Sequence, residues 1–439
     1  MKQVAQHDDI SPESRFGRLL AIEPDSVRCP FAAYSDLRSE HPVTWSSRLN
    51  AWVVSRYADI REVLRDPATF SSKAASGPSS VTSLARHIAE SSEFPERTRR
   101  QAERRLRLSQ SPVLLNSDPP AHKRQRGLVS TAFAPRRVAQ MEPQIQQVTD
   151  DLIDAFVAEG QVEFIGDFAL PLPMTVIATI LGVPPSLMHT FKRWSGAFTQ
   201  GVGALNLSRQ EIIDLFQSVD EFYDYFSEQL DRRRAEPADD LLTHLLEARL
   251  EGEQPLTQDE LLQMLVQFLV GGNETTTNLI GSTMLHLLRD RELTARAKAD
   301  PSLIPTLVEE CLRLEAPTQG MFRTATVDCK VGGQAIPADS MLYLVYGSGN
   351  HDASVFPDPE RIELDDSRGH HLAFGRGEHV CLGANLARKE ANIAIRTLLK
   401  RLDDIALATE PENVSYHNSF ILRGPRSLPM TFRPGQARK

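Results

Sequence analysis

A cysteine among glycines is the residue whose surroundings most favour chemistry in this chain. Cys381 stands in the segment Phe374-Gly-Arg-Gly-Glu-His-Val-Cys-Leu-Gly383, and the run 384–399 that follows predicts a helix. The three glycines permit positive φ and leave backbone N–H groups free to converge on one atom. Such donors, together with a helix start, lower the pKa of a thiol and favour a thiolate that binds a soft metal. The alternative for a lone cysteine is a small buried apolar residue.

A second group of candidate residues lies inside the most regular helical pattern of the chain. The pattern begins with a capping box, Thr257-Gln-Asp-Glu260, and its apolar spacing continues to Leu288, which corresponds to about 50 Å of helix. Its centre, Gly271-Gly272-Asn273-Glu274-Thr275-Thr276-Thr277, consists of weak helix formers. One interpretation is a kink, or two helices joined at the glycines, with Glu274 in solvent. The other is a groove where a ligand approaches the backbone and where Glu274 and Thr275 deliver protons.

The cysteine loop, the centre of the long helix and three further segments each match a sequence motif. Residues 374–383 match F-G-x-G-x-H-x-C-x-G at every specified position, and residues 271–275 match A/G-G-x-D/E-T. The others are Glu310-Cys-Leu-Arg313, Phe356-Pro-Asp-Pro-Glu-Arg361 and Asp118-Pro-Pro-Ala-His-Lys-Arg-Gln-Arg126. On these motifs the chain resembles the haem-binding cytochrome P-450 superfamily, most closely its soluble bacterial branch, over nearly its whole length. The departures are Gly271 for the commoner alanine, Ala121 for glutamate and Ile362 for phenylalanine.

The resemblance implies a role for each matched residue. Cys381 would be the axial ligand of the iron in haem b, with Phe374 packed beside the sulfur. Thr275 would hold a hydrogen-bond network to bound oxygen, and Glu274 would connect that network to solvent. The other residues expected at the cofactor are the propionate donors His379, His122, Arg126 and Arg323, the loop glycines Gly375 and Gly383, and Gly271 and Gly272, which open space for dioxygen. A buried structural cluster under the loop is expected from Glu310, Arg313 and Arg361.

The substrate pocket is the least specified part of this expectation. By resemblance it is lined by Gln267, Val270, Gly320, Met321, Phe322 and Phe420, and it would be mostly apolar. Members of the family hydroxylate terpenes, macrolides, fatty acids and aromatic acids. The basic run at 97–107 either attracts an anionic substrate or carrier protein, or is a solvated charged helix.

The expected fold is mainly α with a small β region, because helical periodicity dominates residues 135–315. Short runs rich in β-branched and aromatic residues predict strands near 51–55, 329–336 and 341–346. No Gly/Ser linker divides the chain, so we expect one cytochrome P-450-type domain over residues 1–439, with residues 1–20 loosely ordered. The resemblance implies a long central helix over the haem, with the Cys-ligand loop beneath it.

The implied activity is a haem-thiolate monooxygenase of secondary metabolism that hydroxylates or epoxidises a small organic molecule with O2. No dinucleotide-binding motif is present, so electrons are expected from a separate ferredoxin-type protein and its NAD(P)H-dependent reductase. The alternatives are a peroxide-driven peroxygenase, a non-catalytic haem-binding protein, and a structural helical protein. The carbon monoxide spectrum of the reduced protein distinguishes thiolate-bound haem from a structural protein.

Composition limits the other function classes. A formal net charge of -9 argues against nucleic-acid binding, and no uninterrupted apolar run is long enough to span a membrane. The four cysteines form no C-x-x-C pair, and the first residues do not resemble a secretory signal. We therefore expect a monomeric cytoplasmic protein.

Overall fold

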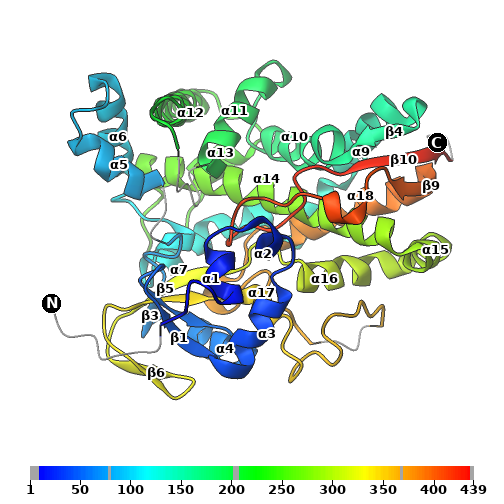
Figure 1. The fold of residues 1–439 in the computed structure, drawn as a ribbon. Coiled ribbons are helices and arrows are strands. Elements are labelled where there is room, and N and C mark those ends of the chain that lie inside the picture. Colours follow the sequence, from blue (N-terminus) through cyan, green and yellow to red (C-terminus); the bar gives the residue numbers. More distant parts are fainter. Residues whose placement is uncertain (1–8, 78–80, 201–206, 366–368, 436–439) are drawn as a thin grey trace. The chain divides into compact units, whose positions relative to one another are not determined.

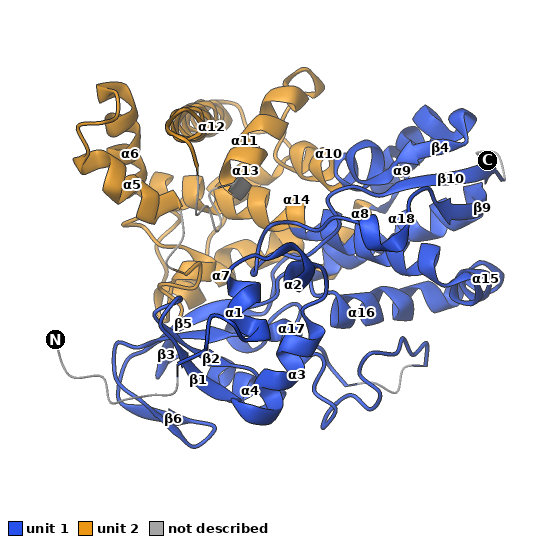
Figure 2. Ribbon diagram, in the orientation of Figure 1, with its two compact units in different colours: residues 1–71, 142–172, 275–439 blue, residues 72–141, 173–274 orange. Residues whose placement is uncertain are grey.

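The computed structural model describes residues 9–77, 81–200, 207–365 and 369–435 (Figure 1). Helices dominate the described residues and the strands form small sheets, so the predicted mainly α fold class is confirmed. The residues group into two compact units, each of which is described by itself (Figure 2). Unit 1 consists of Met1–Ser71, Glu142–Leu172 and Thr275–Lys439, and unit 2 of Ser72–Met141 and Pro173–Glu274.

All described sheets belong to unit 1. The five-stranded sheet has the order β1 (Val43–Ser46), β2 (Ala51–Val54), β8 (Met341–Leu344), β5 (Met321–Ala325), β3 (Phe70–Ser71). The three-stranded sheet has the order β4 (Gln161–Glu163), β10 (Pro429–Pro434), β9 (Leu402–Leu407). A hairpin pairs β6 (Cys329–Val331) with β7 (Gln334–Ile336).

The three strand regions predicted from composition are confirmed as β2, β6 with β7, and β8. Strand β2 is buried along its whole length because it lies between antiparallel β1 and parallel β8. The β6–β7 hairpin turns at Gly332 and Gly333, whose φ angles of 55° and 84° are left-handed and therefore favour glycine. The remaining strands have no comparable apolar run in the sequence. Apart from β1, they form because they pair with segments that are distant along the chain.

The other regular elements described in unit 1 are helices. They are α1 (Arg15–Leu20), α2 (Pro24–Arg28), α3 (Phe31–Glu40), α4 (Tyr57–Arg65), α9 (Glu142–Phe156), α15 (Arg291–Ala299), α16 (Ile304–Leu314), α17 (Tyr346–Gly349) and α18 (Ala384–Arg401). Short helical turns are η3 (Val157–Glu159), η4 (Ile165–Ala169), η6 (Pro301–Leu303), η7 (Gly377–His379) and η8 (Pro411–Asn413). One core cluster joins Trp52 of β2, Ile60 of α4 and Leu342 of β8 with Phe356 and Leu372. The segment that leads to the cysteine loop is thereby anchored on the sheet.

Unit 2 is helical throughout its described residues. Its helices are α5 (Val81–Glu90), α6 (Glu96–Leu108), α7 (Ala121–Val129), α8 (Pro135–Gln140), α11 (Met188–Gln200), α12 (Arg209–Ala235) and α13 (Leu241–Glu247), with the short turns η1 (Leu114–Asn116), η2 (Ser130–Phe133) and η5 (Pro185–Leu187). Two helices, α10 (Pro171–Ile180) and α14 (Gln258–Arg289), contain residues of both units.

Helix α14 is one continuous α-helix of 32 residues. The predicted capping box is confirmed, since Thr257 N–H donates to Glu260 Oε2 at 2.9 Å and Glu260 N–H to Thr257 Oγ1 at 3.2 Å. The interpretation as two helices joined at the glycines is wrong, because the helix runs through both of them. Each glycine costs about 1 kcal/mol relative to alanine, and burial of apolar residues on both sides, such as Leu269 and Ile280, offsets that cost.

Residues 1–20, expected to be loosely ordered, are described from residue 9 onward. Residues 1–8 of the stretch expected to be loosely ordered lie outside the described residues, and Arg15–Leu20 form α1 behind the Ser14 cap. A single domain over 1–439 remains a prediction. Among the described residues, no helix combines the length and apolar character needed to cross a membrane.

Candidate functional site

The cysteine loop presents its thiol at the surface of unit 1. Cys381 is exposed, and its N–H donates to the carbonyl of Phe374 at 2.9 Å, which closes the loop. Gly375 and Gly377 have φ of 66° and 72°, and a Cβ at Gly377 would lie 2.4 Å from the Leu64 carbonyl oxygen, so only glycine fits there. Gly383 has a φ of -84° at the N-cap of α18, so it does not use the positive φ that glycine permits.

A balanced pair of charges lies next to this loop. Arg388 of α18 stacks its guanidinium 4.5 Å from the Phe374 ring centre and donates to both Glu309 oxygens, at 2.6 and 2.8 Å. Burial alone would raise the pKa of Glu309, but the hydrogen bonds and charges of Arg388 and His371 lower it to about 2. The Glu309 hydrogen bond and, to a smaller extent, the charge of Cys381 raise the pKa of Arg388. A permanent cation is thus held close to the thiol.

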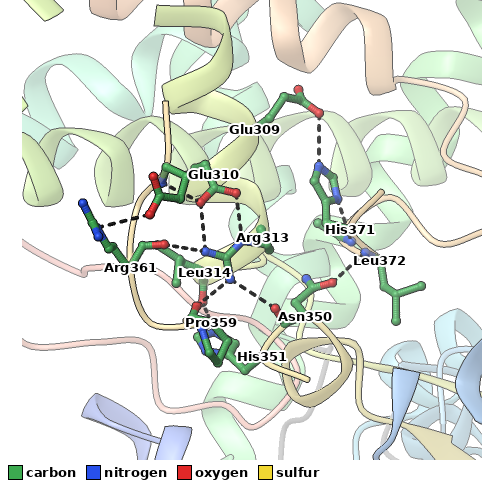
Figure 3. Close-up of polar contacts among 12 residues, drawn as sticks. Glu309, Glu310, Arg313, Leu314, Asn350, His351, Pro359, Arg361, His371 and Leu372 are labelled. Atoms are coloured by element: carbon green, nitrogen blue, oxygen red, sulfur yellow. Dashed lines mark hydrogen bonds and ion pairs between the residues drawn. The ribbon is translucent and has the colours of Figure 1, made fainter. Parts of the chain in front are cut away.

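Beneath the loop, a buried ion pair ties α16 to the segment 350–363 (Figure 3). Arg313 is 1% exposed and donates to Glu310 Oε1 and Oε2 at 2.8 and 2.9 Å. It also donates to the carbonyl oxygens of Pro359 at 2.6 Å and Asn350 at 3.2 Å. Asn350 Oδ1 in turn accepts from the N–H of Leu372 at 2.6 Å, at the entrance to the loop. The pair therefore holds the backbone that presents Cys381.

Arg361 does not place its side chain in this cluster, so that part of the expectation is wrong. Its side chain is 72% exposed and pairs with Glu363, with 3.2 Å between Nε and Oε1. Only its carbonyl oxygen joins the cluster, accepting from Arg313 Nη2 at 2.9 Å (Figure 3). Three carbonyl oxygens already satisfy the buried Arg313 guanidinium, so a second buried cation would lack an anionic partner.

The remaining expected residues of unit 1 differ in their surroundings. Arg323 of β5 is 4% exposed, and Nη1 donates to the Phe322 carbonyl at 2.7 Å, but no described carboxylate pairs with it. The His379 side chain is 8% exposed, with Nε2 lying 3.5 Å from Glu378 Oε1. Thr275 is half-buried on α14.

In unit 2, His122 and Arg126 lie one turn apart on α7, as predicted. His122 is 2% exposed, and burial followed by the charge of Arg126 lowers its pKa, which keeps the imidazole neutral near neutral pH. On α14, a Cβ at Gly271 would meet no described atom within 4 Å, and one at Gly272 would meet only Ile177 at 3.8 Å. Burial raises the pKa of the neighbouring Glu274 carboxyl.

The expected substrate-lining residues fall into two groups. In unit 2, Gln267 binds the backbone of Val113 and Leu115, and Val270 is half-buried one turn further on. In unit 1, Phe322 and Phe420 pack on the Tyr343 ring with centroid distances of 4.8 and 5.6 Å. Gly320 lies against the same ring, and Met321 is half-buried on β5. Their contact with a substrate stays a prediction.

These residues fit the haem that the resemblance implies. The Arg323 guanidinium is buried without a described carboxylate, and such a charge is stable only if an anion such as a propionate accompanies it. The exposed thiol of Cys381 is accessible to a metal, and the open flank of Gly271 and Gly272 leaves space for a small diatomic molecule.

Two residues at this site escaped prediction. Glu309 carried one weak signal, its position directly before Glu310 of the E-x-x-R motif. Asn350 carried none, because its role depends on Arg313 and Leu372, which are 37 and 22 positions away in sequence.

Comparison with known proteins gives a consistent result. The family model described as Cytochrome P450 matches residues 205–430. Cytochrome P450 107B1 of Saccharopolyspora erythraea is 36% identical over 422 residues, covering 95% of this chain and 98% of the relative. The 6-deoxyerythronolide B hydroxylase of the same organism is 33% identical and covers 93% and 98%. The solved structure of CYP109Q5 from Chondromyces apiculatus has a TM-score of 0.81 at 36% identity, covering 95% and 98%.

The buried ion pair gives a test that separates Arg313 from Arg361. Arg313→Met leaves the Glu310 carboxylate buried without its partner, and removing one member of such a pair costs about 3–5 kcal/mol. Arg361→Ala removes an exposed side chain and should change the free energy of unfolding by no more than about 0.5 kcal/mol. Chemical unfolding followed by circular dichroism measures both, and equal losses would place the Arg361 guanidinium in the cluster after all.

The lowered pKa of Glu309 predicts an acid-sensitive contribution to stability. A carboxyl with a folded pKa of about 2 and an ordinary value of 4.5 stabilises the protein fully above about pH 4.5 and progressively less as the pH falls toward 2. Glu309→Gln should therefore lower the unfolding temperature at pH 6, and its curve should converge with the wild-type curve as the pH falls.

Glu251→Gln is the matched control, because Glu251 is exposed and should follow the wild-type curve throughout. A difference between Glu309→Gln and wild type that stayed constant from pH 6 to pH 3 would contradict the assignment.

Proposed function

This chain belongs to the cytochrome P450 family and is a monooxygenase, and from that premise we propose that it inserts one atom of O2 into an organic small molecule. The balanced reaction is RH + O2 + two electrons + two protons to ROH + H2O. The family supplies the haem cofactor, the need for redox partners and the class of reaction. The single observation that supports this assignment best is the exposed Cys381 thiol in a closed, glycine-dependent loop beside a fixed cation.

The cofactor we propose is haem b, and when bound it supplies the redox chemistry that activates oxygen. Cys381 would provide its thiolate as the axial ligand, and the nearby Arg388 charge favours the ionised sulfur. Phe374 would shield that sulfur from water. The groups proposed to face the propionates are Arg323, His379, His122 and Arg126, with Gly375 and Gly383 shaping the loop.

Proton delivery is assigned to neighbouring residues of α14. The open flank of Gly271 and Gly272 leaves room for a small reactant against the helix backbone. The Thr275 hydroxyl would hold a proton for the reaction, and Glu274, whose pKa is raised by burial, would pass protons from solvent to it. A carboxyl of raised pKa suits this relay because it carries a proton for a larger fraction of the time near neutral pH.

The substrate class and electron donor come from the same premise. A mostly apolar pocket is proposed from Val270, Phe322 and Phe420, with a role in secondary metabolism like that of the hydroxylase relative. A ferredoxin-type protein with an NAD(P)H-dependent reductase would deliver electrons at the surface around Arg376, so turnover should fall as salt is raised. Arg388 is bound to Glu309, so we assign it to the thiol environment rather than to docking.

The thiolate assignment is tested by replacing Cys381. The reduced wild-type protein with carbon monoxide should show the strongly red-shifted Soret band of thiolate-bound haem, and Cys381→Ala should lose it because no sulfur remains to bind iron. Cys29→Ala removes another exposed thiol and should keep the band. A red-shifted band in Cys381→Ala would overturn the ligand assignment, and a wild-type protein without the band would overturn the proposed function.

The proton relay is tested at Thr275. Thr275→Ala should keep the carbon monoxide spectrum but divert reducing equivalents from product to hydrogen peroxide, because protons are no longer delivered in an ordered way. Thr275→Ser retains the hydroxyl and should retain most of the coupling. Product formed per NAD(P)H consumed is the measurement. Unchanged coupling in Thr275→Ala would show that the relay lies elsewhere, as in a peroxide-driven enzyme.

A further inference from the structure

Helix α6 of unit 2 is rich in arginine, and its arginines differ in exposure and in their partners. Arg97, Arg100 and Arg107 are exposed, and Arg104 pairs with Asp220 and Asp224 of α12. The three exposed arginines are solvated, and the half-buried Arg104 is balanced by two aspartates. Arg105 is half-buried and differs from them in its partners.

Every described partner of Arg105 is neutral. Its Nη1 donates to Tyr223 Oη of α12 at 2.8 Å and to Gln263 Oε1 of α14 at 2.7 Å. Both partner residues are buried. Its Nε is buried and has no hydrogen-bond partner among the residues that the structure describes, and no described carboxylate pairs with the guanidinium. The aspartates of α12 that could have done so are bound to Arg104.

This arrangement leaves one edge of the guanidinium unused. Nε and Nη2 form the fork that binds a carboxylate through two parallel hydrogen bonds, and neither donates to a described residue. A partly buried cation whose partners are all neutral is stabilised when an anion joins it. The Tyr223 and Gln263 bonds fix the other edge, so the free edge is already oriented for a ligand.

The residue spacing along α14 gives the axial distance from Gln263, which binds Arg105, to the proposed place of reaction beside Gly271. Gln263, Gln267, Val270 and Glu274 recur at intervals of four, three and four residues, so they share one face of α14. Gly271 and Glu274 follow Gln263 by eight and eleven residues, which corresponds to about 12 and 16 Å along the helix axis. An extended chain covers about 3.5 Å per three bonds, so about ten to fourteen carbon–carbon bonds bridge that distance.

We infer that Arg105 binds the carboxylate of a medium- to long-chain organic acid and thereby determines which carbon reaches the groove. Arg105 is then a specificity-determining residue, and the substrate class is an alkyl carboxylic acid oxidised about ten to fourteen carbons from its head group. This inference rests on the proposed function, since it takes the flank of Gly271 as the place of reaction.

The test uses the full-length haem-loaded protein and measures binding by calorimetry and by the spin-state shift of the Soret band. Dodecanoate should bind the wild type about tenfold or more tightly than methyl dodecanoate, because a charged hydrogen bond is lost with the ester. Arg105→Gln should bind both equally, and Arg105→Lys should recover part of the preference for the acid. Arg107→Gln removes an exposed arginine of the same helix and should behave as wild type.

A second readout follows the position of oxidation. Hexadecanoate should be oxidised mainly about ten to fourteen carbons from the carboxylate by the wild type and at scattered positions by Arg105→Gln. Equal wild-type affinity for dodecanoate and its methyl ester would overturn the inference whether or not the variants fold. An equal loss in Arg107→Gln would also overturn it, since diffuse surface charge would then explain the preference. A missing thiolate spectrum in the wild type would instead refute the proposed function, while the calorimetric comparison would still decide whether Arg105 binds acids.

Discussion

The buried pair of Glu310 and Arg313 is the interaction on which the presentation of the thiol depends. Two charges removed from water are stable only when their hydrogen-bonding groups are all used, and here backbone groups of a long irregular segment use them. Arg313 fixes the carbonyls of Asn350, Pro359 and Arg361, and Glu310 accepts from the N–H of Glu363 at 3.0 Å. The side chain of Asn350 accepts from the N–H of Leu372, and the carbonyl of Leu372 accepts from the N–H of Gly375 at 2.8 Å. A segment without regular secondary structure therefore acquires one conformation from a single charged side chain.

Helix α14 stays continuous although weak helix formers occupy its centre. The sequence at its centre is poor for a helix, yet a capping box at its start and buried apolar residues on either side keep it continuous. Asn273 contributes a hydrogen bond to Ser195 at 2.8 Å. The glycines therefore leave out side chains without breaking the helix, and a Cβ at either position would have at most one neighbouring side chain, that of Ile177.

Two arginines in different units share one physical property. Arg323 is buried and Arg105 is half-buried, and neither has a described carboxylate to balance its charge. A protein stabilised only by its own contacts would rarely retain such groups, because an uncompensated buried charge costs several kcal/mol, roughly the effect of a severe mutation. The anions that we propose for them are the propionate of the cofactor for Arg323 and the carboxylate of a substrate for Arg105.

The sequence by itself determined the family, the mainly helical fold, the long helix with its cap and the loop around Cys381, because these depend on residues close together in the chain. Local patterns also located β2, the β6–β7 hairpin and β8. Only the tertiary structure decided that Gly383 takes an ordinary φ, that the Arg361 side chain points to solvent and that Glu309 holds the charged Arg388 in place. It alone showed that one arginine of a basic helix meets Gln263, 158 positions away. The physical reason is that burial and charge balance depend on partners distant in sequence, whereas caps, turns and metal-ligand loops are specified by their immediate neighbours.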